Sequence, residues 1–175
     1  MPGSWTHLTA RFFDVVTARP LNTDEDSFVD EFLSPVERSM FDAQNTADQR
    51  HGVECGLDVA STTERRDLVR AAILHDVGKR HVGLGAVGRV LASVVTKLGL
   101  PARGAISLYR SHGEMGAQEL EETGAEKLVV DFVRHHHSER PPTVSQADWE
   151  VLVAADHARV RRGQYSAGGR SGASA

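Results

Sequence analysis

The sequence has few features of secreted, membrane-spanning or nucleic acid-coating proteins. Cysteine occurs once, at Cys55, so no internal disulfide can form and zinc frameworks built from two or more cysteines of this chain are excluded. No apolar run approaches membrane-spanning length, and the first residues, Met1-Pro2-Gly3, are not followed by a cationic stretch and an apolar run. The formal net charge of −4 does not favour strong nucleic acid binding. We therefore expect a cytoplasmic protein without a membrane partner.

The length of 175 residues and the hydrophobic content of 40% suit one domain with a substantial core. Residues 1–44 precede this domain and are expected to form an N-terminal helical extension. The main domain is expected over residues 45–165. The last ten residues, 166–175, are rich in glycine, serine and alanine and are expected to be a disordered tail.

Helix-start signals recur along the chain, each a serine or threonine followed three residues later by an acidic or amide residue. They are Thr23/Asp26, Ser34/Glu37 with Pro35 at the first helical position, Thr46/Gln49, Ser61/Glu64, Ser111/Glu114 and Ser145/Asp148. No segment shows the sustained period-2 alternation of a strand. The sequence therefore predicts an all-α fold, with helices near 4–18, 24–33, 35–43, 46–60, 62–77, 85–99, 103–110, 112–122, 125–137 and 145–160.

Histidines and aspartates are spread over five separate segments of the chain. They are His51, the pair His75-Asp76, His112, the run His135-His136-His137, and Asp156. Imidazole nitrogens and carboxylate oxygens together suit divalent first-row metals. Ligands drawn from distant segments favour a site enclosed by packed elements, so the pattern indicates a metalloenzyme.

Helical periodicity tests which of these side chains face the core. Asp156 continues the apolar face that carries Leu152, and a carboxylate directed at a core needs a partner. His136 and His137 continue two apolar rows of the helix expected over 125–137, whereas His135 continues a polar row. We therefore expect His136 and His137, rather than His135, to be ligands.

The helix before His75 is apolar almost all round over residues 68–74, which is typical of a central helix. It delivers His75 and Asp76 just before Gly78, where we expect the helix to end. A single inward histidine is more often a hydrogen-bonded core residue than a ligand. A core that holds this many histidines and aspartates together would be badly destabilised unless cations bind them.

The space around two further histidines is also consistent with a ligand role. His51 shares its helical face with Ala47 and Cys55, and His112 shares its face with Gly116. We expect these small neighbours to leave room for a metal.

The ordered set resembles the HD superfamily of metal-dependent phosphohydrolases over about residues 45 to 160. The resemblance rests on His51, the segment Leu-His-Asp-Val-Gly-Lys at 74–79, His112, the pair His136-His137, and Asp156. It implies a compact multi-helix bundle in which His51, His75, Asp76 and Asp156 hold one divalent metal. In members with extra histidines, Asp76 also bridges to a second metal held by His112, His136 and His137. The resemblance thus implies two metals per chain, drawn from Mn, Mg, Co, Ni or Fe.

Within the superfamily the motifs look most like the branch that hydrolyses cyclic dinucleotides. The chain departs from that branch at residues 138–142, where Ser-Glu-Arg-Pro-Pro stands in place of a glycine-tyrosine-proline signature. The implied activity is hydrolysis of a small phosphorylated substrate, either a nucleotide or another phosphomonoester or phosphodiester. Asp76 would orient the attacking water, and Lys79 would neutralise a phosphate oxygen. The alternative for Lys79 is a solvated lysine just past a helix end.

Two other functions are compatible with the same residues. Some proteins that resemble this superfamily use such a ligand set for a mixed-valent di-iron centre that activates oxygen. A non-catalytic nucleotide-binding regulatory module is the third interpretation, which the intact ligand set disfavours. The glycine pattern at 83–88 matches a dinucleotide-binding motif, but no strand precedes it, so we interpret it as a flexible loop over the metal site.

Overall fold

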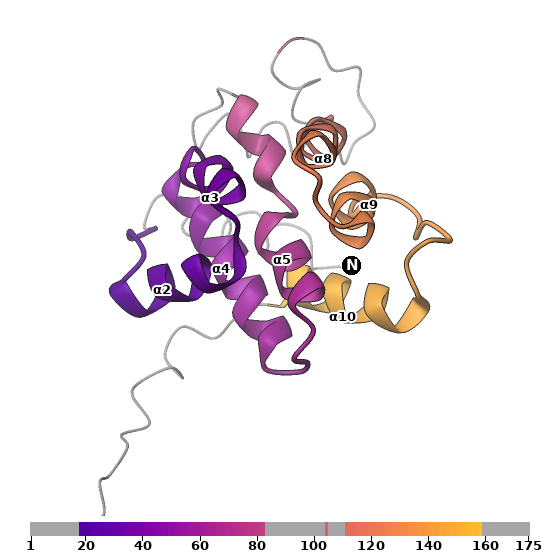
Figure 1. Ribbon diagram of the computed structural model, residues 1–175, viewed down its shortest axis with the longest axis horizontal. Coiled ribbons are helices and arrows are strands. Elements are labelled where there is room, and N and C mark those ends of the chain that lie inside the picture. Colours follow the sequence, from indigo (N-terminus) through magenta and orange to yellow (C-terminus); the bar gives the residue numbers. More distant parts are fainter. Residues whose placement is uncertain (1–17, 83–103, 105–110, 159–175) are drawn as a thin grey trace, which may run out of the picture.

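The computed structural model describes residues 18–82, 104 and 111–158, which form helices and contain no strand (Figure 1). The α-helices are α2 (Thr23–Phe32), α3 (Pro35–Asp42), α4 (Thr46–Ala60), α5 (Arg66–Leu74), α8 (His112–Glu122), α9 (Lys127–His135) and α10 (Gln146–His157). A short 3₁₀ helix, η1, spans Val77–His81. The expected all-α fold is confirmed. Within the described ranges, no helix is long and apolar enough to cross a membrane.

Several expected segments lie outside the described residues. They are the helices over 4–18, 85–99 and 103–110, the glycine segment 83–88 and the tail 166–175, apart from Ala18 and Gly104. Gly104 lies in a turn with φ of 60°, so the helix expected from residue 103 cannot include it.

Side-chain caps define most of the helix starts. Ser34 and Glu37 form the expected capping box at the start of α3, and Ser145 accepts a hydrogen bond from the backbone N–H of Asp148 at 3.1 Å. α4 spans the expected residues 46–60, whereas α2 starts one residue earlier than expected. In both helices the cap is the asparagine before the expected threonine, because Asn22 and Asn45 accept the bonds from the first helical N–H groups. Ser111 precedes α8 without a side-chain cap bond.

The helix expected over 62–77 is wrong at both ends. Ser61 ends α4, its hydroxyl donating to the carbonyl of Asp58, and α5 starts only after Arg65, which provides no side-chain cap. The helix stops at Leu74 and a 3₁₀ turn follows. Both motif residues, His75 and Asp76, therefore lie in the link between two helices rather than inside one.

Helix α5 is the centre of the molecule (Figure 1). Its residues Leu68 and Val69 and every residue from 71 to 74 are buried, and the helix packs on α4, α9, α10 and α2. The apolar pattern of residues 68–74 thus indicated its central place correctly. The helices that follow the glycine-containing middle of the chain, α8 and α9, pack on each other and complete the same hydrophobic core.

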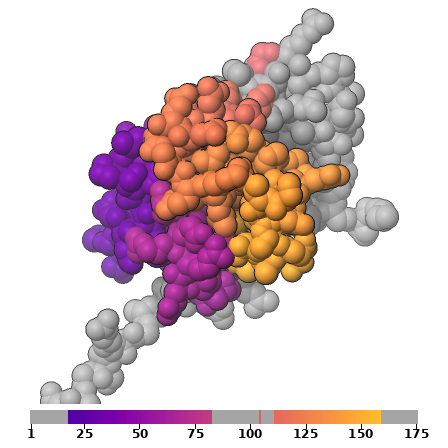
Figure 2. All heavy atoms as spheres, turned by 45° about the vertical axis from the view of Figure 1, so that its right-hand side comes forward, coloured from indigo at the N-terminus to yellow at the C-terminus, as the bar shows by residue number. Residues whose placement is uncertain are grey.

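The N-terminal helices belong to that core as well. Val29 of α2 and Phe41 of α3 are fully buried in the same cluster as the residues of α5 and α9. Arg70 of α5 joins the parts by ion pairs to the buried Glu37 at 2.6 Å and to Glu126. In the space-filling view the indigo, magenta, orange and yellow parts form one packed body (Figure 2).

Candidate metal centre

Side chains from five segments meet around Asp76, in the link that follows α5. On one side lies the thiol-side group, which we define as His51 and Cys55 of α4, His75, and Asp156 of α10. On the other side lies the imidazole group, defined as His112 of α8 and His136 and His137 at the end of α9. The structure thus brings together all seven residues expected as ligands and adds a thiol.

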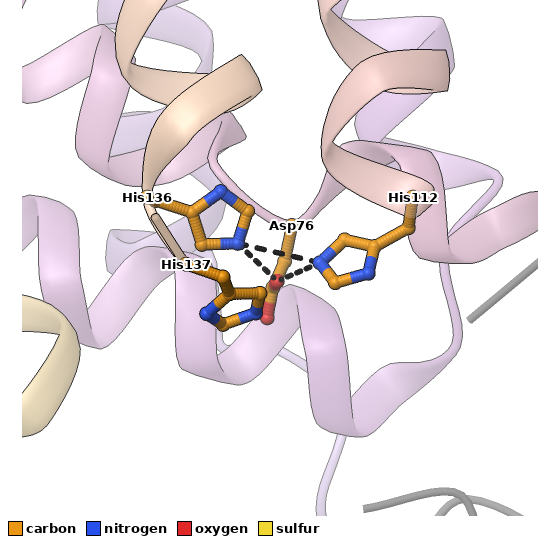
Figure 3. Close-up of side chains that lie close together, drawn as sticks. All are labelled: Asp76, His112, His136 and His137. Carbon is orange, nitrogen blue, oxygen red and sulfur yellow. Dashed lines mark hydrogen bonds and ion pairs between the residues drawn. The ribbon is translucent and has the colours of Figure 1, made fainter. Parts of the chain in front are cut away.

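The imidazole group surrounds one oxygen of the shared carboxylate (Figure 3). Oδ1 of Asp76 lies 3.2 Å from Nε2 of His112 and 3.5 Å from Nε2 of His136. The same two nitrogens are 3.3 Å apart. The ring of His137 stacks near that of His136, with 3.9 Å between ring centroids. Two imidazoles therefore contact one carboxylate oxygen, and donor atoms of all three rings and of Asp76 lie within 4.8 Å of one another.

The thiol-side group surrounds a different carboxylate. Oδ1 of Asp156 lies 3.2 Å from Nε2 of His51 and 3.3 Å from Nε2 of His75. Nε2 of His75 is also 3.5 Å from Oδ2 of Asp76, the oxygen that faces away from His112. Asp76 therefore presents one oxygen to each group.

Backbone carbonyls orient two of the imidazoles. Nδ1 of His75 lies 2.7 Å from the carbonyl oxygen of Ala72, and Nδ1 of His136 lies 2.8 Å from that of Val133. A carbonyl only accepts, so in each ring Nδ1 carries a hydrogen, and Nε2 is the ring nitrogen that a cation can bind once it is deprotonated. This outer hydrogen bond is the usual support of a histidine that binds a metal through Nε2.

Three helices end at the site. His75 directly follows α5, His136 directly follows α9, and Asp156 lies in the last turn of α10. Two helices begin there, because His112 is the first residue of α8 and Asp76 directly precedes the short η1. The carboxyl ends of helices, which carry partial negative charge, thus outnumber the amino ends around the carboxylates.

The two groups are held together by direct contact of two backbones. A Cβ on Gly78 would lie 1.9 Å from the carbonyl oxygen of His112 and 2.9 Å from the backbone nitrogen of Gly116. Gly78 does not end α5, and it is not among the positive-φ glycines of the described residues. The expected role as a helix terminator is therefore wrong, and Gly78 is required for the close approach of η1 to α8.

Neighbouring groups lower the pKa of both aspartates despite their burial. Burial raises the pKa of Asp76, but Lys79 and His75 outweigh this and hold it well below its usual range. Burial likewise opposes ionisation of Asp156, yet hydrogen bonds from His51 and His75 keep its pKa well below normal. Burial lowers the pKa of His75, and the carboxylates of Asp76 and Asp156 reverse this and raise it to about 9. Both carboxylates are therefore anionic near neutral pH.

In the imidazole group, two histidines have a lowered pKa, in contrast to the raised pKa of His75. Desolvation lowers the pKa of His136, and desolvation together with His136 lowers the pKa of His137 to about 3. Both rings are neutral at pH 7, the form in which histidine binds a metal. On the other side, burial and then the charge of Asp156 raise the pKa of the Cys55 thiol well above its usual value.

Lys79 is buried at 4% exposure and contacts Oδ2 of Asp76. The alternative of a solvated lysine past a helix end is therefore wrong. Its ammonium group instead lies beside the shared carboxylate and lowers the pKa of Asp76.

The donor atoms fit divalent cations. Two ligands of one ion, each at about 2.1 Å, lie about 3.0 Å apart in an octahedral site and about 3.4 Å apart in a tetrahedral one. The separations given above among nitrogen and oxygen donors in the two groups, 3.2 to 3.5 Å, lie close to these values. In addition, Nε2 of His75 and Oδ1 of Asp76 are buried without a well-formed hydrogen bond in the described part of the chain. Bound cations would satisfy both atoms.

Among the described histidines outside the two groups, His135 and His81 have ordinary partners. Nδ1 of His135 lies 3.3 Å from the hydroxyl of Ser138, and His81 lies 2.9 Å from Glu119. The residue that the sequence argument missed is Cys55, which it treated only as a small neighbour. The available signal was its position four residues after His51, one turn along the same helical face.

The HD domain family model matches residues 47–164, which is more than half of the chain. No curated protein and no solved structure matches the chain. The matched range contains both groups of donor atoms, and the chain therefore belongs to the HD domain family of metal-dependent hydrolases.

Proposed function

We propose that this protein is a phosphohydrolase that uses two divalent cations to hydrolyse a small phosphorylated substrate. Either a nucleotide or another phosphomonoester or phosphodiester is the expected substrate class. The observation that supports this most is the position of Asp76, whose two carboxylate oxygens face different donor groups. A carboxylate shared in this way is what a pair of neighbouring cations requires.

The donor groups suggest how the cations would be divided. His51, His75 and Asp156 would hold one ion together with Asp76, and the other would be held by Asp76 and the imidazole group. When bound, such a pair would polarise phosphoryl oxygens, favour ionisation of water near neutral pH and stabilise the charge on the leaving oxygen.

The chain's own residues would supply orientation and charge. Asp76 is ionised and accepts hydrogen bonds, so a water molecule beside it would be held with one hydrogen toward the carboxylate. The ammonium group of Lys79 is fixed by burial and by its contact with Asp76. A positive charge held there favours an anionic phosphate group without further ordering of the lysine.

The test combines metal analysis with a substrate screen on the full chain. The protein is stripped of metal and reloaded separately with Mn²⁺, Mg²⁺, Co²⁺, Ni²⁺ or Fe²⁺. Metal content is measured by elemental analysis, and phosphate or nucleotide release is measured on simple esters, nucleotides and cyclic dinucleotides. We expect about two metals per chain and turnover that depends on them.

His135→Ala is the matched control for this test. Its ring neighbours the ligand pair in sequence but lies outside both groups, so metal content and turnover should stay near wild type. His136→Ala should lower both. Metal binding without release of phosphate from any substrate would argue against the proposal. Two irons with oxygen consumption and no hydrolysis would replace it with an oxygen-activating enzyme.

A further inference from the structure

The thiol of Cys55 lies among the donor atoms of the thiol-side group. Its Sγ is 3.7 Å from Nδ1 and 3.8 Å from Nε2 of His51, one helical turn earlier in α4. Donor atoms of His51, Cys55 and His75 all lie within 4.8 Å of one another. The side chain is 2% exposed, so its position is set by packing rather than by solvent.

These distances are those of ligands on one ion. A sulfur at about 2.3 Å and a nitrogen at about 2.0 Å from a tetrahedral ion lie about 3.5 Å apart. The separations between Sγ and the ring nitrogens of His51 exceed this by only a few tenths of an ångström. The carboxylate of Asp156 belongs to the same set, because its Oδ1 lies 3.2 and 3.3 Å from the two histidines.

A second observation also indicates a ligand at this place. Nε2 of His75 is a buried atom with no well-formed hydrogen bond, and the side chain is 1% exposed. Nε2 is the ring nitrogen that faces the other donors of the thiol-side group, because Nδ1 is engaged by the carbonyl of Ala72. A cation bound here would displace any proton on Nε2 and satisfy this buried atom.

We propose that Cys55 is a ligand of the thiol-side metal, adding one sulfur to the donors of His51, His75, Asp156 and the shared Asp76. Such a set selects thiophilic ions such as Zn²⁺ and Co²⁺ over Mn²⁺ and Mg²⁺. The imidazole group has no sulfur and takes ions that prefer nitrogen and oxygen. The inference rests on the metal centre of the proposed function, but not on hydrolysis.

Binding of a cation through Cys55 would replace the S–H bond with a bond from sulfur to the cation and would release one proton. In the metal-free form the thiol donates to the carbonyl oxygen of Ala155 at 3.4 Å. On binding, the S–H bond breaks, the proton passes to solvent and the sulfur electron pair forms the bond to the cation. No electron is transferred, so the step needs neither an oxidant nor a reductant.

The test uses Co²⁺ added to the metal-free full chain, followed by absorption spectroscopy. A thiolate bound to Co²⁺ produces a sulfur-to-cobalt charge-transfer band in the near ultraviolet. Cys55 is the single cysteine, so this band can come from no other residue of the chain. We expect the band to saturate with about one Co²⁺ per chain and to vanish in Cys55→Ser.

His112→Ala is the matched control, because it removes a donor from the opposite group. It should keep the band while lowering the total number of bound Co²⁺ ions. In competition measurements, Cys55→Ser should lower the preference for Zn²⁺ over Mn²⁺ by at least about tenfold. If Cys55→Ser does not fold, the wild-type band still decides, since only one thiol exists.

The outcomes separate this inference from the proposed function. Co²⁺ binding without a charge-transfer band would overturn the role of Cys55 and leave the two-metal hydrolase standing. No Co²⁺ binding at all would overturn the metal centre and with it both proposals. A band that saturates and disappears with Cys55→Ser would support the ligand role even if no substrate is hydrolysed.

Discussion

The two groups of donors around Asp76 differ in charge and in chemistry. The thiol-side group contains a second carboxylate, Asp156, and a thiol, and its carboxylates favour a protonated His75. The imidazole group contributes three imidazoles, of which His136 and His137 have a lowered pKa, and its one carboxylate is that of the shared Asp76. Under the two proposals, one carboxylate joins two sites with different metal preferences, and each site should respond separately to substitution.

The largest effect is expected from Asp76→Ala, which breaks both groups together. Bound metal should fall from about two ions to fewer than one per chain, and turnover should fall by at least about 100-fold, because both ions lose a shared ligand. Asp76→Asn should give the same loss while keeping the side-chain volume. Elemental analysis and steady-state rates test this, and metal content at the wild-type level would refute Asp76 as the shared ligand.

Gly78→Ala should disturb the spacing between the groups without touching a ligand. The added methyl group would meet the carbonyl of His112, so η1 and α8 must separate. We expect a loss of about 3 kcal/mol or more in the free energy of unfolding, measured by denaturant titration. Gly124→Ala is the control: an added methyl group there would meet no neighbouring atom, so its cost would come only from the φ of 78°. Equal losses for the two variants would contradict a role for the close approach.

Removal of one histidine from each group sharpens the comparison further. His51→Ala should remove the thiol-side metal and leave the imidazole-group metal, and His136→Ala should do the reverse. Each variant should bind about one ion per chain and lose turnover by about 10 to 100-fold or more. Cobalt spectra distinguish them, because only His136→Ala should retain the sulfur band. Loss of both ions in either variant would mean that the groups do not bind independently.

The smallest effect is a dependence of stability on pH in the metal-free protein. Burial disfavours charged His75, but its neighbouring carboxylates raise its folded pKa to about 9, above the unfolded value of about 6.5. The resulting stabilisation is full below about pH 6.5 and is lost as pH rises through 9. We expect a decrease in Tm on the order of 5 °C across this window, absent in His75→Gln and in metal-loaded protein. A flat metal-free profile would contradict it.

Local signals predicted the fold class and several helix starts, because a cap depends on residues three positions apart. Ser34 and Ser145 stand alone as good caps and were placed correctly. Asn22 and Asn45 precede threonines that can also cap, so the sequence did not discriminate between adjacent starts. The break after Leu74 could not be predicted, because the contact of Gly78 with α8 decides it and that contact joins distant segments.

Helical periodicity placed His136 and His137 toward the site and His135 away from it, since the rotation between neighbouring residues is a local property. That His136 and His137 bind a metal remains a prediction. The proximity of Lys79 to Asp76 and of Cys55 to the donors of two other helices depends on how α4, α5 and α10 pack. Periodicity in one helix carries no information about that packing.

The convergence of three helix carboxyl ends on the site has a consequence for the order in which cations and substrate bind. Each carboxyl end adds partial negative potential, and the ends of α5, α9 and α10 are opposed by the amino ends of α8 and the short η1. In the metal-free protein Lys79 and His75 balance the two ionised aspartates, so these groups leave no net positive charge to attract a phosphate before cations bind. We therefore expect ordered binding: the metal-free protein does not bind phosphorylated compounds, and it gains affinity for them only after cations are bound.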